Sequence, residues 1–179
     1  MRGLRDSRAW FGCVALIAAG AAAGCAGPMA TQRSAAAPRL TTPAFSVAVP
    51  AGWTRARVAG RPFDMWRFAG PGGRELDILS GTGEETIEHS VAHGLGNLRA
   101  TLTNPRVGPV RVTAAPGGRK RARVALTGAD PRTGRPVGIA VVSIQGADRR
   151  FFSAVLRAPG RTPPTRRLDA LLRDLRLSR

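Results

Sequence analysis

The stretch that decides the fold runs from residue 119 to residue 158 and reads "RKRARVALTGADPRTGRPVGIAVVSIQGADRRFFSAVLRA". It contains three runs rich in Val, Ile, Leu, Ala and Phe, and the segments between them are rich in Gly, Asp and Pro. Apolar runs separated by turn-forming residues are typical of neighbouring strands. We therefore predict strands over Arg119–Thr127, Pro136–Gln145 and Arg150–Ala158.

Charged and apolar side chains alternate along the first of these strands. Because successive side chains of a strand point to opposite sides, Arg119, Arg121 and Arg123 fall on one face and aliphatic residues fall on the other. The pattern predicts a strand with a basic outer face. The three arginines are therefore candidate binding residues for an anionic partner.

Further strands precede this stretch. The segment "FSVAVPAGW", residues 45–53, alternates large and small side chains and then turns at a Pro and a Gly. A "GPGG" segment, typical of a hairpin, separates the apolar runs Phe63–Ala69 and Arg74–Ser80. Period-two alternation bounded by turn residues predicts a strand in each case, and Arg106–Ala114 has the same character.

Two helices are predicted as well. Thr82 and Glu85 match a capping box at the start of the first helix, and Asn104-Pro105 ends it, because proline cannot continue a helix. Its apolar stripe is Ile87, Val91, Leu95, Leu98 and Leu102. The second helix starts with Thr162 as N-cap and Pro163 at the first helical position. Its apolar stripe is Leu168, Leu171, Leu172 and Leu175.

The order of these elements is three strands, a helix, four strands and a helix. Such an order suits a mainly antiparallel sheet covered by two helices, an α+β sandwich. Residues 43–179 provide enough chain for one domain of this kind.

The N-terminus has the pattern of an export signal. Arg2, Arg5 and Arg8 precede an uncharged run from Trp10 to Gly24, which is too short to span a hydrocarbon core of ~30 Å comfortably. Cys25 follows directly. We expect residues 1–24 to be a lipoprotein signal peptide and the sulfur of Cys25 to carry the lipid.

Two interpretations of this signal stay open. Bacterial lipoprotein signals usually have Leu three residues before the cysteine, where this chain has Ala22. The alternative is an ordinary secretory signal that is cleaved at an A-x-A-like site. Residues 25–42 are rich in Ala, Pro, Ser and Thr and have no hydrophobic periodicity, so we expect them to form the acylated cysteine and a flexible tether.

A resemblance can be named on the residues of the first strand and turn. The pattern F-x-V-x-V-P-x-G-W at residues 45–53, a helix after the third strand and a closing helix resemble the PsbP/Mog1-like fold. More narrowly, they resemble the actinobacterial Lpq-type (LpqN-like) lipoproteins. The resemblance implies a membrane-tethered, non-enzymatic domain at the outer face of the cytoplasmic membrane.

The chain is strongly basic, with a formal net charge of +17, and removal of residues 1–24 would leave +15. Such charge attracts anionic surfaces. Nucleic acid is disfavoured as a partner, because the signal exports the chain and no recognition-helix or aromatic-basic motif is present. The remaining partners are the membrane itself, anionic lipid, glycolipid, cell-wall polymer or another envelope protein.

No pattern in the sequence indicates catalysis, a metal or a cofactor. His89 and His93 are spaced like metal ligands on a helix, but they lie opposite the apolar stripe and are expected to be exposed. Glu75 and Asp77 share a strand face, and among so many arginines they are expected to form ion pairs.

The expected function is therefore that of a non-enzymatic binding or adaptor domain. The alternative is a carrier or sensor of envelope lipids or glycolipids with an apolar pocket between the sheet and the first helix. Trp53 and Trp66 are further candidate binding residues, because aromatic side chains that are not used in the core could line such a pocket.

Overall fold

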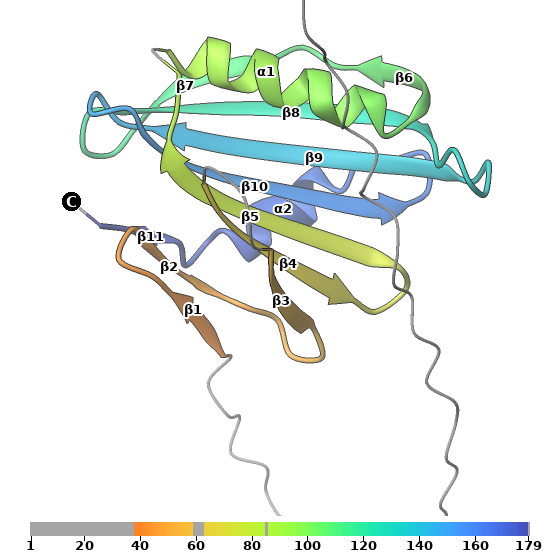
Figure 1. The fold of residues 1–179 in the computed structure, drawn as a ribbon, viewed down its shortest axis with the longest axis horizontal. Helices are drawn as coiled ribbons and strands as arrows, with labels where there is room; N and C mark the ends of the chain where they lie inside the picture. The colour runs from red at the N-terminus through yellow and green to blue at the C-terminus, as the bar shows by residue number, and fades with distance from the viewer. Residues whose placement is uncertain (1–37, 59–62, 85, 179) are drawn as a thin grey trace, which may run out of the picture. The chain divides into compact units, whose positions relative to one another are not determined.

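The computed structural model of the chain describes residues 38–58, 63–84 and 86–178. Most of them belong to two antiparallel sheets (Figure 1). The larger sheet has the order β3-β4-β5-β10-β9-β8-β6, and β7 also pairs with β8. Its strands are β3 (Thr54–Val58), β4 (Asp64–Gly70), β5 (Arg74–Thr82), β6 (Thr103–Val107), β7 (Arg111–Ala115), β8 (Arg119–Ala129), β9 (Pro136–Gln145) and β10 (Arg150–Pro159).

The smaller sheet has three strands in the order β1-β2-β11. Its strands are β1 (Arg39–Thr41), β2 (Phe45–Ala48) and β11 (Arg176–Leu177). β2 is the first strand predicted from the sequence. β1 lies in the stretch that we expected to be tether, and Leu40 is almost fully buried in the core. The folded part of the chain therefore includes residues 38–42.

Two helices complete the described chain. α1 (Ile87–Ala100) follows β5 and precedes β6, and α2 (Thr165–Leu171) lies between β10 and β11. The cap of α1 is Thr86, whose side chain accepts a hydrogen bond from the backbone N–H of His89 at 3.3 Å. Thr82, the predicted cap, is instead the last residue of β5. The second helix begins at Thr165, three residues after its predicted cap.

The predicted fold class is wrong. About half of the described residues lie in strands and about a sixth in helices, so the fold is β-rich and is not an α+β sandwich with two helices covering a sheet. The physical reason is that α2 is too short to cover its face of the large sheet, and the three-stranded sheet packs there as well. This second sheet was not visible in the sequence pattern.

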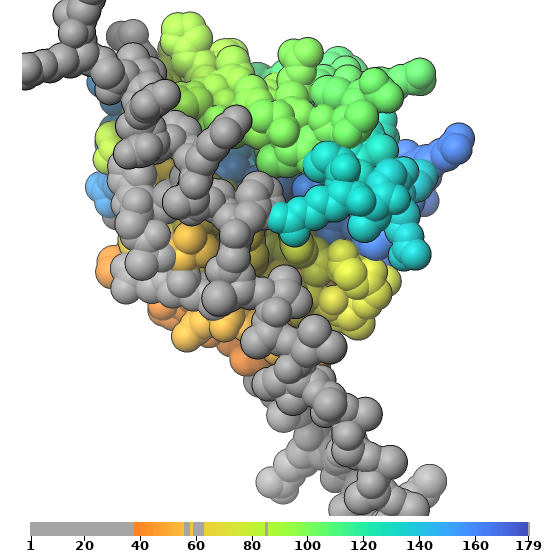
Figure 2. Space-filling model, turned by 45° about the vertical axis from the view of Figure 1, so that its right-hand side comes forward, coloured from red at the N-terminus to blue at the C-terminus, as the bar shows by residue number. Residues whose placement is uncertain are grey.

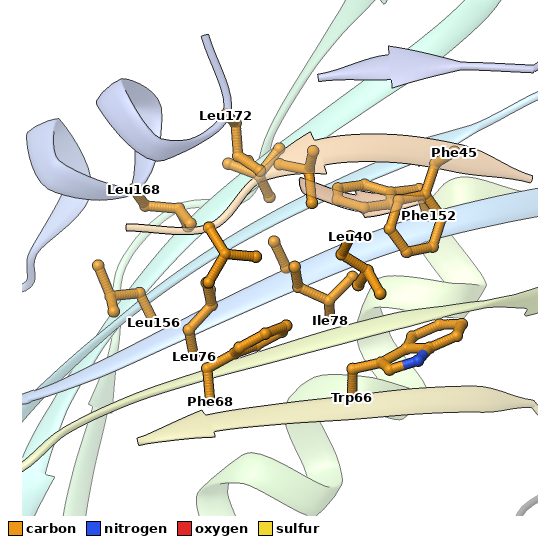
Figure 3. Close-up of a cluster of buried hydrophobic side chains, with 14 of the residues drawn as sticks. Leu40, Phe45, Trp66, Phe68, Leu76, Ile78, Phe152, Leu156, Leu168 and Leu172 are labelled. Carbon is orange, nitrogen blue, oxygen red and sulfur yellow. The ribbon is translucent and has the colours of Figure 1, made fainter. Parts of the chain in front are cut away.

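The two faces of the large sheet have separate cores. The face toward α2 and the small sheet, here called the α2 face, is filled by large aromatic and aliphatic side chains (Figure 3). In this core the ring of Phe45, from the small sheet, packs edge-on against two other rings. Its centroid lies 5.4 Å from that of Trp66 and 5.0 Å from that of Phe152. The opposite face, here called the α1 face, has a smaller core formed by α1, β8 and β9.

Candidate ligand-binding groove

A groove lies between α1 and the large sheet and has a volume of about 620 Å³. α1 packs against β8, β9 and β6, and the groove extends along the same face onto β10, β5 and β4. Figure 2 shows the side of the molecule on which α1 (green) lies above the β4–β5 turn (yellow). The apolar lining consists of Phe63, Met65, Leu79, Ile87, Val91, Leu95, Leu98, Val141, Phe151 and Val155.

Four residues of the helical stripe predicted from the sequence line one wall of this groove, whereas the fifth, Leu102, lies beyond the end of α1 and packs in the core of the α1 face. Ile87 and Val91 are buried against the sheet, whereas Leu95 and Leu98 are only partly buried. The first half of α1 is therefore buried more deeply than the second half, and both halves line the groove. Phe63 and Phe151 meet edge-on with ring centroids 6.3 Å apart and contribute aromatic surface to the lining.

A hydrogen-bonded network holds the N-terminal end of α1 against the sheet. The Gln145 side chain, only 5% exposed, donates through Nε2 to the backbone oxygen of Glu84 at 2.6 Å. Its Oε1 accepts from the Ser90 hydroxyl at 3.3 Å, and that hydroxyl accepts from the Glu84 N–H at 3.1 Å. Since each side-chain polar atom of Gln145 has a protein partner, this residue acts as a fixed end wall.

Two hydroxyl groups lie in the floor of the groove. Ser143 on β9 and Ser153 on β10 face each other directly across the strand pair, with their Oγ atoms 2.9 Å apart. One hydroxyl donates to the other, so the hydrogen of the accepting hydroxyl is not used in this bond. The floor can therefore offer one hydrogen-bond donor, and free lone pairs, to a ligand.

The groove contains little charge, although the chain carries 28 Lys and Arg residues. None of its lining residues is a lysine or an arginine, and its titratable groups are Glu84 and His93. His93 Nδ1 lies 3.5 Å from Glu84 Oε1, and both side chains are well exposed at the rim. Because a charged group is costly to bury without a partner, the interior of the groove suits an uncharged molecule.

The predicted aromatic binding residues lie elsewhere. Trp66 is buried on the α2 face, packed edge-on to Phe45. Trp53 is half-buried and packs against the same core. Its ring lies over Gly70, where an added Cβ would be 2.5 Å from the indole. Neither tryptophan lines the groove, so both serve the packing of the α2 face.

Arg119, Arg121 and Arg123 share one face of β8, as predicted, but this face points toward α2 and the C-terminal strand. Asp169 Oδ1 on α2 lies 3.3 Å from Arg121 Nη2 and 2.9 Å from Arg123 Nη2. Arg119 Nη2 donates to the Ser178 backbone oxygen at 2.7 Å. Burial, and then the neighbouring charge of Arg123, lower the pKa of Arg121. These arginines hold elements together and do not form a free basic surface.

Asp77 on β5 is an ion-pair partner. Asp77 accepts two hydrogen bonds from Arg67, at 2.8 and 2.9 Å. These hydrogen bonds raise the pKa of Arg67. The expectation of an ion pair is confirmed for Asp77, and the doubly bonded carboxylate is committed to this partner.

The sequence also raised expectations about a lipid anchor, metal binding and the membrane. Cys25 and the predicted signal peptide lie outside residues 38–58, 63–84 and 86–178. Within those ranges no cluster of three or more His, Cys, Asp or Glu could hold a metal ion. No helix in the same part of the chain is both long enough and apolar enough to cross a membrane.

Sequence reasoning did not single out the residues that form the sheet side of the groove, although Phe63 and Phe151 belong to the six Trp and Phe side chains from which a groove lining was expected to come. Their signal was present in β10, where Phe151 and Val155 are apolar on the face opposite Phe152, Ala154 and Leu156. A strand that is apolar on both sides needs cover on both sides. The second apolar face therefore indicated that a helix or a ligand would lie on it.

Comparisons with known proteins give a likeness of fold alone. No family model matches this chain, and no curated protein matches it. The structure is similar to a crystal structure from Bacteroides thetaiotaomicron VPI-5482, with a TM-score of 0.54 and 12% sequence identity. The match covers 81% of this chain and 50% of the other, so this chain spans about half the length of that protein.

Proposed function

We propose that this domain is a non-catalytic carrier or sensor that binds an apolar, lipid-like molecule in the groove between α1 and the large sheet. The observation that carries the proposal is the groove itself, about 620 Å³ in volume and lined mainly by aliphatic and aromatic side chains. Sites for small molecules typically have volumes of ~300–1,000 Å³ and an apolar lining with a few polar groups. The groove has both properties.

The chemistry of the lining defines the class of ligand. Aliphatic side chains would take a hydrocarbon chain or ring, and the hydroxyl groups of Ser143 and Ser153 would take one hydroxyl or carbonyl oxygen. The absence of lysine and arginine from the lining disfavours a ligand whose anionic group enters the groove. We therefore infer an uncharged chain or ring with a single polar group, or the uncharged tail of a larger amphiphile.

The sequence supports a place for this activity at the outer face of the cytoplasmic membrane. An export signal over residues 1–24, a lipid on Cys25 and a tether after it would hold the domain near the bilayer. Two or more acyl chains give stable attachment, whereas one chain is marginal. A tethered domain with an apolar groove could then exchange lipid-like molecules with the membrane.

The structure gives less support to an adaptor that binds its partner through the basic face of β8. It depends on Arg119, Arg121 and Arg123 as a free basic face, and their contacts are with Asp169 and the C-terminal backbone. An envelope partner would have to use another surface.

The carrier proposal is tested by measuring bound lipid and by blocking the groove. Native mass spectrometry and organic extraction of the purified full-length chain should detect an apolar molecule, and a fluorescent apolar probe should bind in the groove. Asn97 is exposed and lines the groove mouth, so Asn97→Trp should weaken probe binding at least tenfold. Arg99 is exposed on the same helix outside the lining, and Arg99→Trp is the matched control.

Three results would contradict the proposal. They are failure of every apolar probe to bind, no co-purifying lipid in repeated preparations, or equal loss of binding in the Asn97 and Arg99 variants. Thermal unfolding of both variants checks that neither substitution has disturbed the fold.

A further inference from the structure

The two halves of α1 are held to the sheet unequally. We call residues 94–100 the second half of the helix and the residues before them the first half. In the first half, Ile87 and Val91 keep only 2% and 5% of their surface exposed. In the second half, the apolar side chains Leu95 and Leu98 are only partly buried. Less apolar surface therefore holds the second half in place.

The entry into the first half is closely packed. A Cβ added to Gly83 would lie 2.9 Å from the Ser90 Oγ, 3.3 Å from the Phe151 ring and 3.4 Å from Gln145 Nε2. Ser90 and Gln145 are also the side chains that hydrogen-bond the backbone N–H and oxygen of Glu84. A shift of the first half would break these hydrogen bonds and contacts, so this half is the fixed part of the helix.

The second half contains two glycines that packing does not require. A Cβ added to Gly94 or Gly96 would meet no atom within 4 Å, and neither residue has a positive φ. Apart from proline, glycine is the least favourable residue in a helix interior, because it loses the most backbone freedom when the helix forms. The two glycines therefore lower the cost of opening the second half without weakening the first.

The chain directly after α1 is held again. Thr101 Oγ1 donates to the Leu98 backbone oxygen at 2.7 Å, and Leu102 is buried in the core of the α1 face. A Cβ added to Gly128 would lie 3.0 Å from the Leu102 Cβ. A segment that is fixed at both ends opens by local loss of its helical hydrogen bonds, as weakly packed segments of folded proteins do. Because Leu95 and Leu98 line the groove, such opening would uncover it.

We propose that residues 94–100 form a gate, which opens transiently to admit and release the apolar ligand while the first half of α1 stays closed against the sheet. In many proteins a few residues that absorb a backbone change control access to a site. The gate rests on the proposed function, since it serves entry only if the groove binds a ligand. The opening itself is a property of the free chain and is tested without a ligand.

Amide hydrogen exchange of the purified full-length chain measures this opening. After correction for intrinsic rates, the amides of residues 97–100 should exchange at least tenfold faster than those of residues 91–93. Gly96→Ala should slow the exchange of residues 97–100 about fivefold, the factor that corresponds to the difference in helix propensity between glycine and alanine. The control is His89→Ala, at an exposed position in the first half, which should leave this exchange unchanged. Uniform exchange along α1 would overturn the gate.

Stopped-flow fluorescence with an apolar probe measures entry and exit. Gly96 lies outside the groove lining, so Gly96→Ala does not fill the groove. It should slow association and dissociation equally, about fivefold, and leave the Kd unchanged, because it stabilises the closed gate in the free and the bound chain alike. Unchanged rates, or equal slowing in the His89→Ala control, would overturn the gate. If residues 97–100 exchange faster but no probe binds, the proposed function is wrong and the role in ligand entry falls with it, whereas the opening stands.

Discussion

Ser143 and Ser153 lie opposite each other on β9 and β10, and their hydroxyl oxygens are 2.9 Å apart in an otherwise apolar groove floor. These two hydroxyl groups are polar groups in the groove floor. The groove lining contains no lysine or arginine. The serine pair therefore determines which polar group a buried ligand can bring with it.

The first prediction concerns this selectivity. If the groove binds apolar chains, dodecanol should bind more tightly than dodecanoate, because the alcohol can use the serine pair and the carboxylate would lose its hydration without a cation to replace it. Ser143→Ala with Ser153→Ala should weaken dodecanol binding about fivefold, the value of one hydrogen bond of ~1 kcal/mol. Displacement of a bound fluorescent probe measures the affinities of dodecanol and dodecanoate for the unmodified chain and for the serine variant. Ser46→Ala on the small sheet is the control, and tighter binding of dodecanoate would contradict the prediction.

The second prediction concerns the contact between α2 and β8. Asp169 lies between Arg121 and Arg123, so Asp169→Asn leaves two neighbouring cations without their shared anion. We expect a loss of about 1 kcal/mol in the free energy of unfolding, the upper range for partly exposed ion pairs, measured by urea denaturation. Asp174→Asn makes the same charge change at an exposed position and should have little effect. Equal effects of the two variants would mean that overall charge, and not this contact, is responsible.

Much of the large sheet could be predicted because its signals are local. The Gly-Pro-Gly-Gly turn and the period-two alternation of Arg74–Thr82 or Arg150–Pro159 need no knowledge of the rest of the chain. The run predicted as one strand over Arg106–Ala114 is in fact divided between β6 and β7. Gly108 still donates its N–H to the Ala125 oxygen of β8, and the division follows at Pro109, which has no N–H to donate.

The small sheet could not be predicted because its strands gain their stability from distant partners. Leu40 is buried in a short segment that is otherwise polar, and β1 forms only by pairing with β2. β11 pairs with β2 from the other end of the chain. The fold class was predicted wrongly for the same reason. β1 and β11 were not predicted, and with β2 they form a sheet on the face that a second helix was expected to cover.

The groove could be predicted only in part. The stripe of α1 was visible in the sequence, but nothing local sets how far the helix lies from the sheet. One contact that holds the start of α1 comes from Gln145, which donates to the backbone oxygen of Glu84 from 61 residues away in sequence. The aromatic residues that seemed available for binding, Trp53 and Trp66, were instead needed by the α2 face.

A third prediction compares the effect on stability of replacing two glycines, Gly138 and Gly96, by alanine. A Cβ on Gly138 in β9 would lie 2.6 Å from the backbone oxygen of Thr162 and 2.9 Å from Cα of Pro163. Because backbone atoms cannot move aside cheaply, Gly138→Ala should destabilise the fold by about 1–3 kcal/mol. Gly96 in α1 has no atom within 4 Å of such a Cβ, so Gly96→Ala should stabilise it by about 0.5–1 kcal/mol. Thermal unfolding measures both, and a neutral Gly138→Ala would show that this loop is not fixed against β9.

The last prediction concerns pH and the turn between β8 and β9. Asp130 Oδ1 accepts hydrogen bonds from the N–H groups of Arg132 and Thr133, and Oδ2 lies 3.1 Å from Arg157 Nη2. These contacts, led by the Arg132 N–H, lower the pKa of Asp130 below its ordinary value of 3.8. A carboxylate with a lowered pKa in the folded state stabilises the fold above its ordinary pKa, and this stabilisation disappears as the pH falls through the folded-state value.

Asp130→Asn retains an oxygen that can accept the turn hydrogen bonds but removes the charge. The midpoint of thermal unfolding should therefore fall by about 3 °C at neutral pH, and the difference from the unmodified chain should shrink as the pH falls below 3.8. Asp174→Asn, at an exposed site whose side chain lies outside this turn, is the matched control and should show no such pH dependence. A difference for Asp130→Asn that stays constant into the acid range would attribute the effect to altered turn geometry and not to the charge.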